Sequence, residues 1–200
     1  MPRTPGQRPR ESFRERRERR AGIDDPDVVL NAAARFLEVR SRSVDEVRRH
    51  LAQAGYQPEL VTAAVVRLTA LGLLDDAAFA RMWVESRDRA RPRSETALRR
   101  ELALKGIGRE LAAEVLDERR RGGAGEEGED GEGPDMVAAE RLLRKRSSAL
   151  ARIAQPRERR QKAYALLARN GFDPEVCREA TNRFLAAAEE AADGPASEAD

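Results

Sequence analysis

One six-residue motif occurs three times in this chain and constrains its fold more than any other feature. In each copy a leucine is followed four residues later by a glycine and then by a large apolar residue. The copies lie at residues 51–56, 102–107 and 167–172. Glycine adopts the left-handed conformation after a helix without a Cβ clash, and the apolar residue behind it can fold back onto the last turn. The motif therefore predicts three equivalent helix ends, at Gly55, Gly106 and Gly171.

The spacing of the motifs indicates an internal repeat. The first two glycines are 51 residues apart and the last two are 65 apart. A 14-residue stretch of low complexity, GGAGEEGEDGEGPD, lies within the longer interval and accounts for the whole difference. Repetition at such a period is typical of helical units that stack because none of them buries a full apolar face alone.

The residues between the motifs predict helices and no strands. The chain is rich in Ala, Leu, Arg and Glu, which favour helices, and no β-branched or aromatic stretch alternates with period two. Apolar residues recur at helical spacing, as at Val29, Ala33 and Phe36. We therefore expect an all-α fold in which three tandem three-helix repeats form an elongated, modular helical protein.

Composition divides the chain into six segments. The first is rich in arginine with almost nothing apolar, so we expect it to be disordered. The stretch after the second repeat is acidic and glycine-rich, which favours a mobile linker that lets the third repeat move. The predicted segments are a disordered basic arm (1–27), repeat 1 (28–74), repeat 2 (75–121), an acidic linker (122–135), repeat 3 (136–188) and an acidic tail (189–200).

Capping residues mark several helix starts. Ser43 stands three residues before Glu46, which is the spacing of a capping box, and Ser94 begins the corresponding helix of repeat 2. Asp75 is a suitable N-cap, and Asp76 adds negative charge to the same first turn. These two carboxylates could instead bind a metal ion, but no other ligand cluster lies nearby in the sequence. Capping alone explains the pair.

The sequence offers no recognisable catalytic site. The single Cys177 and the single His50 exclude an intrachain disulfide and a Cys/His zinc cluster. No nucleophile can be assigned to His50, which we expect to be exposed on a helix, and no phosphate-binding loop occurs. Trp83 and Cys177 lie on apolar stripes and are expected in the core. We therefore predict a protein that is not an enzyme, without catalytic residues, metal ions or cofactors.

The same features indicate a compartment. One cysteine is ordinary in the reducing cytoplasm, and no apolar run approaches the length needed to cross a membrane. The arginine-rich start has no apolar segment typical of a secretion signal. We expect a cytoplasmic monomer that makes no membrane contact.

Positive charge is concentrated in the third repeat, where it predicts a binding surface. Three cations at i, i+3 and i+4 share a helix face, and a second group crowds the start of the next helix against the preference of the helix dipole. Conflict of this kind is expected where function overrides folding. We expect contact with an acidic protein surface, or with phosphates of single- or double-stranded DNA. The candidate residues are Arg141, Arg144, Lys145, Arg146, Arg157, Arg159, Arg160 and Lys162.

The first two repeats carry a family resemblance. The segments RSRSVDEVRRHLAQAGY, LTALGLLDDAAFARMWVESR and LRRELALKGI closely resemble the RecX family of recombinase regulators. The most specific parts are the LLDDxxFA junction and the L-x-x-KGI ending. The likeness spans about residues 28 to 120, and the third repeat matches more loosely.

The resemblance implies a function. Proteins of the family consist of tandem three-helix repeats, are cytoplasmic, and bind the RecA recombinase filament on single-stranded DNA along its groove. They dampen its ATPase, strand-exchange and coprotease activities, and so act in homologous recombination and the SOS response. The residues alone leave an alternative, a free-standing helical DNA-binding regulator. The third helix of repeat 1, ELVTAAVVRLTALG, offers few polar side chains for sequence-specific reading of bases.

Overall fold

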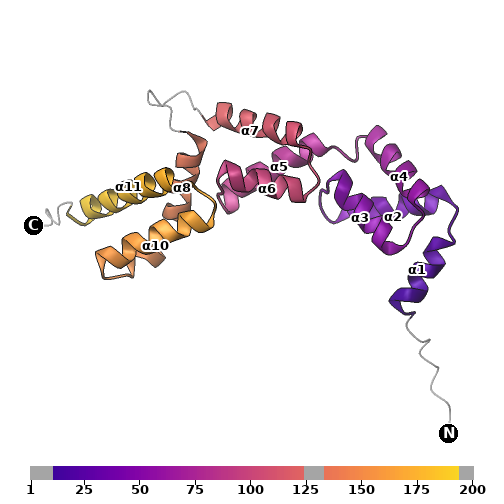
Figure 1. The fold of residues 1–200 in the computed structure, drawn as a ribbon, viewed down its shortest axis with the longest axis horizontal. Coiled ribbons are helices and arrows are strands. Elements are labelled where there is room, and N and C mark those ends of the chain that lie inside the picture. The colour runs from indigo at the N-terminus through magenta and orange to yellow at the C-terminus, as the bar shows by residue number, and fades with distance from the viewer. Residues whose placement is uncertain (1–10, 124–132, 194–200) are drawn as a thin grey trace, which may run out of the picture. The chain divides into compact units, whose positions relative to one another are not determined.

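The computed structural model describes residues 11–123 and 133–193, and within these ranges it contains helices and turns but no strand (Figure 1). This confirms the predicted all-α fold. The helices of the described part are α1 (Phe13–Ala21), α2 (Pro26–Glu38), α3 (Val44–Ala54), α4 (Pro58–Ala70), α5 (Asp76–Ala90), α6 (Glu95–Leu104), α7 (Arg109–Gly123), α8 (Pro134–Lys145), α9 (Ser147–Ala151), α10 (Pro156–Arg169) and α11 (Pro174–Asp193).

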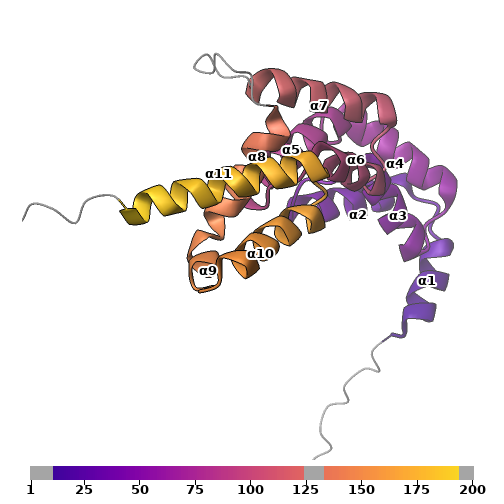
Figure 2. The ribbon, with the colours of Figure 1, turned by 60° about the vertical axis from the view of Figure 1, so that its left-hand side comes forward.

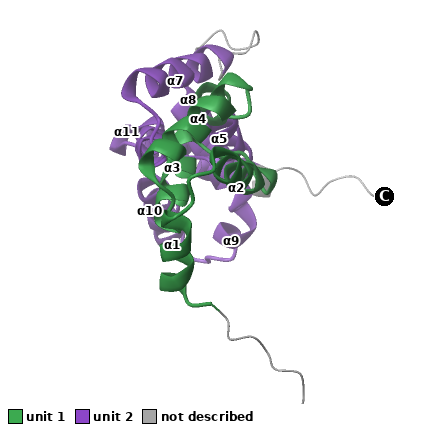
Figure 3. Cartoon of the chain, turned by 90° about the vertical axis from the view of Figure 1, so that its right-hand side faces the viewer, with its two compact units in different colours: residues 1–79 green, residues 80–200 purple. Residues whose placement is uncertain are grey.

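The chain forms two compact units, which are coloured separately in Figure 3. The first unit is Met1–Phe79, in which α2 packs against α4 and both contact α3. Their apolar faces meet in one core because each helix carries apolar residues at helical spacing. The buried residues of this core are Val29, Ala33, Val47, Leu51, Val61, Ala64, Val65, Leu68 and Leu74.

The second unit, Ala80–Asp200, contains most of the second repeat and all of the third. In the third repeat α11 packs against both α8 and α10, and the short helix α9 connects those two (Figure 2). Helix α9 is an addition that the three-helix prediction did not include. The core of the third repeat consists of Ala138, Ala139, Leu142, Leu143, Leu150, Ala163, Leu167, Phe172, Cys177 and Ala180.

The three glycine turns have the predicted geometry. The φ angles of Gly55, Gly106 and Gly171 are 102°, 79° and 90°, in the left-handed region. In each turn the residue after the glycine donates its backbone N–H to the carbonyl of the motif's leucine, which closes the helix end. These bonds join Tyr56 to Leu51 (3.3 Å), Ile107 to Leu102 (3.0 Å) and Phe172 to Leu167 (3.4 Å).

Two of these glycines also let a neighbouring helix approach closely. A Cβ on Gly55 would lie 2.8 Å from the backbone carbonyl oxygen of Arg17 in α1. A Cβ on Gly171 would lie 2.9 Å from the Cβ of Ala97 and from Oγ of Ser94, at the start of α6. The Ser94 hydroxyl donates to the Gly171 carbonyl at 2.7 Å. The glycine turn that ends α3 therefore also contacts α1, and the turn that ends α10 also contacts the start of α6.

A second recurring contact connects consecutive repeats through a serine and an aspartate, and we call it the serine–aspartate joint. Ser43 and Ser94 are fully buried N-caps, and each hydroxyl accepts a backbone N–H three residues ahead at 3.1 Å. The amide directly after each serine is bound by an aspartate from the start of the following repeat. Val44 N–H donates to Asp76 Oδ1 at 2.9 Å, and Glu95 N–H donates to Asp135 Oδ1 at 2.9 Å.

Asp75 and Asp76 have different roles, although the sequence places both at the start of α5. Asp75 caps α5 as predicted, because its Oδ1 accepts the N–H groups of Ala77 and Ala78 at 2.8 and 2.9 Å. Asp76 instead reaches back to the start of α3. Burial raises the pKa of the Asp76 and Asp135 carboxyls, while the backbone hydrogen bond each accepts opposes that shift.

Arg119 fastens the joint between the second and third repeats. Its guanidinium donates to Asp88 in α5 through two bonds of 2.9 Å and to Asp135 in α8 at 3.1 Å. The Arg119 side chain is only 8% exposed. Because three helices meet at this ion-paired group, α8 is held against the second repeat within one compact unit.

The structure corrects the prediction that residues 1–27 form a disordered arm. Residues 1–10 lie outside the described part, but Phe13–Ala21 is helix α1, and α2 already begins at Pro26. A capping box between Ser12 and Glu15 starts α1. The Gln57 side chain then donates to the carbonyls of Ala21 (3.0 Å) and Ile23 (3.1 Å). A sequence reading that counted apolar residues could not register these polar contacts.

The helix bounds also differ from those predicted for the linker and the tail. Helix α7 continues to Gly123 and α8 begins at Pro134, so the ends of the predicted linker 122–135 are helical. Residues 124–132 lie outside the described part. Asp135 and Gly171 bind residues of the second repeat. Movement of the third repeat relative to the first two stays a prediction. Helix α11 extends through Asp193, past the predicted tail start at 189.

Substitution of Gly55 by alanine tests the close approach of α1. Gly72 provides the control because its φ is also positive, at 69°, yet a Cβ there meets nothing within 4 Å. We expect Gly72→Ala to lower the free energy of unfolding by about 1–2 kcal/mol through backbone strain. Gly55→Ala should lower it by about 1–3 kcal/mol more because α1 must shift. Urea unfolding of the two variants measures the difference, and equal losses would show that α1 does not dock on Gly55.

Replacement of Arg119 by methionine tests the ion-paired joint. We expect Arg119→Met to lower the free energy of unfolding by about 3–5 kcal/mol near pH 7, since Asp88 and Asp135 keep their charge without the arginine that neutralises it. Asp135 has a raised pKa, so its neutral form is favoured in the folded protein and its ionisation destabilises that protein as the pH rises. The deficit of Arg119→Met should therefore shrink as the pH falls toward the ordinary aspartate pKa of 3.8.

The exposed pair Arg81–Glu118 supplies the control for that experiment. It also joins α5 to α7, but its side chains are 53% and 42% exposed. Arg81→Met should change stability by less than about 1 kcal/mol. An Arg119→Met deficit as small as that of the control, or one independent of pH, contradicts the role assigned to Arg119.

Candidate interaction surface

Two of the predicted contact residues on α8 bind the end of another helix. Arg141 donates to the Asp88 carbonyl at 3.3 Å, and Lys145 donates to the carbonyls of Arg89 and Ala90. These carbonyls belong to the last turn of α5, where the helix dipole favours cations. Both cations thus help to hold α8 against α5, a role that their spacing along α8 did not indicate.

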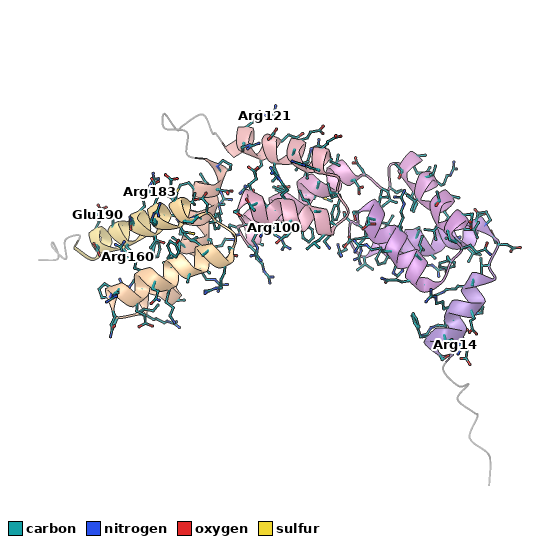
Figure 4. All side chains as sticks on the ribbon, in the orientation of Figure 1. Arg14, Arg100, Arg121, Arg160, Arg183 and Glu190 are labelled. Carbon is teal, nitrogen blue, oxygen red and sulfur yellow. The ribbon has the colours of Figure 1, made fainter. Side chains whose placement is uncertain are left out.

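The predicted residues of α10 also differ in their surroundings. Arg159 donates twice to the Ile153 carbonyl, at 3.1 and 2.9 Å, and so closes the loop before α10. Arg160 donates to the side chain of Asn182 in α11, and Figure 4 labels Arg160 on α10. Lys162 lies 3.8 Å from Glu158 one turn earlier in an exposed ion pair. All three contacts lie within the third repeat, and Arg160 and Lys162 are exposed.

The other three predicted residues are exposed, and their side chains have no hydrogen bond or ion pair with any residue that the structure describes. They are Arg144, Arg146 and Arg157, which we call the free arginines. They lie at the end of α8, directly before α9 and in the first turn of α10, and these three helices contact one another. Arg157 occupies the positive end of its helix dipole, an unfavourable place for a cation.

Arg144 borders a groove between α8, α9, α10 and α11. The groove has a volume of about 440 Å³. Its lining combines apolar residues, including Phe184 and Ala187, with the charged residues Glu140, Arg144, Arg159 and Arg183. Arg183 approaches Glu140 at 3.4 Å. A lining that combines apolar groups with three arginines suits a partner that presents acidic and apolar groups together.

The sequence analysis missed Arg183 and the groove. Arg183 follows Cys177 by six residues on α11, and nothing in its local pattern separates it from the other surface arginines of this chain. It joins Arg144 and Arg159 only because α11 packs across both α8 and α10. Only the tertiary contact brings these side chains together.

Trp83 corrects another prediction. The ring is half-buried rather than part of the core, and its Nε1 donates to Glu101 at 2.9 Å. The Arg87 guanidinium and the Lys105 ammonium lie 4.4 and 4.7 Å from the ring centroid. Cations over the ring make Trp83 a poor platform for a nucleic-acid base.

His50 and Cys177 have the surroundings that the sequence predicted. His50 is exposed on α3 and stacks on Phe36, with ring centroids 3.8 Å apart. Cys177 is fully buried, and burial raises the pKa of its thiol. Within residues 11–123 and 133–193, no group of three or more His, Cys, Asp or Glu side chains is arranged to hold a metal ion. None of the helices in those ranges is long and apolar enough to span a membrane.

Family models match most of the described chain. The first, second and third three-helix domains of RecX match residues 30–68, 75–116 and 135–181. Whole proteins named "Regulatory protein RecX" are also similar. The one from Prosthecochloris aestuarii is 30% identical over 80% of this chain and 96% of its own length. The one from Mycobacterium avium is 35% identical over 78% of this chain and 84% of its own length.

A solved structure agrees with the fold. The crystal structure of RecX from Lactobacillus salivarius matches 82% of this chain and 98% of its own chain with a TM-score of 0.62, at 18% sequence identity. At that identity the likeness concerns the fold alone. The domain matches, in the same order along the chain, and the identity to whole relatives establish that this chain belongs to the RecX family.

Proposed function

We propose that this chain is a non-enzymatic cytoplasmic regulator that binds the RecA recombinase filament on single-stranded DNA. It lowers the ATPase, strand-exchange and coprotease activities of the filament, and thereby acts on homologous recombination and the SOS response. The observation that carries the proposal is the match of three consecutive RecX domains in one chain. Relatives that match about 80% of this chain bear the name of a regulatory protein.

The repeated architecture supports binding to a repeating partner. A filament presents the same surface at regular intervals, and linked modules gain avidity when each makes a weak contact. The second and third repeats belong to one compact unit, in which Arg119 and Asp135 fix the packing of α8. Contacts from these two repeats would therefore form together, with little loss of conformational freedom between them.

The free arginines supply the chemistry of one such contact. The side chains of Arg144, Arg146 and Arg157 form no ion pair with a described residue, so docking breaks none. Arginine binds carboxylates and phosphates through paired N–H groups. The same residues can therefore bind an acidic recombinase surface or the DNA within the filament.

Reversal of these three charges tests the proposed contact. We expect the variant Arg144→Glu, Arg146→Glu, Arg157→Glu to need about tenfold more protein to inhibit RecA, because repulsion replaces attraction at the interface. The measurement is DNA strand exchange and single-strand-dependent ATPase by the cognate recombinase, titrated from well below one molecule per recombinase monomer. Lys145 and Arg160 are left unchanged because they bind groups of this chain.

The control makes the same change of net charge elsewhere. Arg35, Arg67 and Arg100 are exposed residues of the first two repeats, and their side chains also have no described partner. Their reversal to glutamate should leave inhibition close to wild type. Equal loss in both triple variants would contradict the assigned surface. No inhibition by the wild-type chain, together with tight binding to bare DNA, would instead favour the free-standing DNA-binding regulator.

A further inference from the structure

Helix α1 places a group of cations beside the first repeat, outside the residues that the family models match. It packs against α3, where Arg17 covers Gly55 and Arg20 donates to the Ala54 carbonyl at 3.5 Å. The Arg20 guanidinium also lies 5.6 Å from the Tyr56 ring centroid. These contacts fix one side of α1 on the first repeat.

A cavity of about 590 Å³ opens between α1 and α3. Its lining side chains come from Phe13, Arg17 and Arg20 of α1 and from His50 and Gln53 of α3. No carboxylate lines it, in contrast to the groove at Glu140 in the third repeat. The cavity therefore combines two cations with two aromatic rings and one amide.

The aromatic side chains of this cavity are available to a ligand. Phe13 is 64% exposed, so a ligand can reach its ring. His50 is stacked parallel to Phe36, with an interplanar angle of 2°, so its ring is held in a fixed orientation. Burial, with help from Arg42 and Arg20, lowers the pKa of His50, and the imidazole is therefore mostly neutral at pH 7.

Arg17 is the cation of α1 without a partner in the described part of the chain. Arg14 pairs with Glu18 at 2.7 Å, and Arg19 pairs with Glu11 at 2.9 Å. Arg16 donates to the Glu11 carbonyl at 2.7 Å. The side chain of Arg17, which borders the cavity, has neither a hydrogen bond nor an ion pair with a described residue.

We propose that this cavity, which we call the α1 site, binds single-stranded nucleic acid, with an unpaired base beside Phe13 and His50 and the adjacent phosphates at Arg17 and Arg20. Proteins bind single strands by combining aromatic faces that stack on bases with cations that follow the backbone. A duplex hides its base faces, so the aromatic rings favour unpaired strands. The site is separate from the free arginines and does not depend on the proposed recombinase partner.

The single histidine of the chain provides a direct test. Titration of the full chain with an oligothymidylate of about ten nucleotides should shift the His50 ring resonances in a proton NMR spectrum, because a stacked base adds a ring current. Phe13→Ala should weaken the affinity derived from this shift about tenfold. Arg17→Ala should weaken it severalfold and lower its salt dependence by about one counterion.

Three controls make the test specific. Arg14→Ala changes a cation of the same helix that lies outside the cavity, and it should bind like wild type. An abasic strand of the same length should bind more weakly, and Phe13→Ala should not weaken it further. Circular dichroism should show the same helix content in every variant, since Phe13 and Arg14 are exposed.

Several results would overturn the α1 site. One is a His50 signal that does not move at saturating oligothymidylate. Another is a loss in Phe13→Ala and Arg17→Ala no greater than in Arg14→Ala. An equal shift with poly-glutamate of matched length would show an anion site that does not recognise bases. The assay contains no recombinase, so its outcome is independent of the strand-exchange measurement.

Discussion

The rest of the structure depends on a left-handed glycine at the end of one helix in each repeat. At Gly55, Gly106 and Gly171 the positive φ lets the next apolar residue return its N–H to a buried leucine carbonyl. The absence of a side chain also admits a neighbour, Arg17 at the first turn and Ser94 at the third. A single backbone requirement therefore sets both the fold of a repeat and the place where its neighbour packs.

The serine–aspartate joint connects each repeat to the one that follows it. Each buried serine caps one helix, and the next amide is bound by an aspartate of the following repeat. Between the second and third repeats Arg119 adds charge pairing on three helices. The free arginines lie in the compact second unit. Helix α8 therefore carries Asp135 of the joint at its start and Arg144 of the proposed contact surface in its last turn.

Sequence reasoning predicted what depends on local geometry and missed what depends on tertiary contacts. The glycine turns, the Ser43 and Ser94 caps and the burial of Cys177 follow from spacing within one or two helices. Helix α1 was missed because polar caps and Gln57 stabilise it instead of apolar residues. The predicted cationic cluster is divided because Lys145 reaches a helix end far away in sequence. No local pattern contains that information.

Co-sedimentation with recombinase filaments tests the central claim most directly. The cognate RecA is assembled on single-stranded DNA with a non-hydrolysable nucleotide, and binding of the chain is compared with binding to the same DNA without recombinase. Linked contacts to successive subunits predict an affinity for the filament at least about tenfold higher than for bare DNA. Equal affinity for the two would contradict regulation through the filament and leave the three repeats as a scaffold for DNA binding alone.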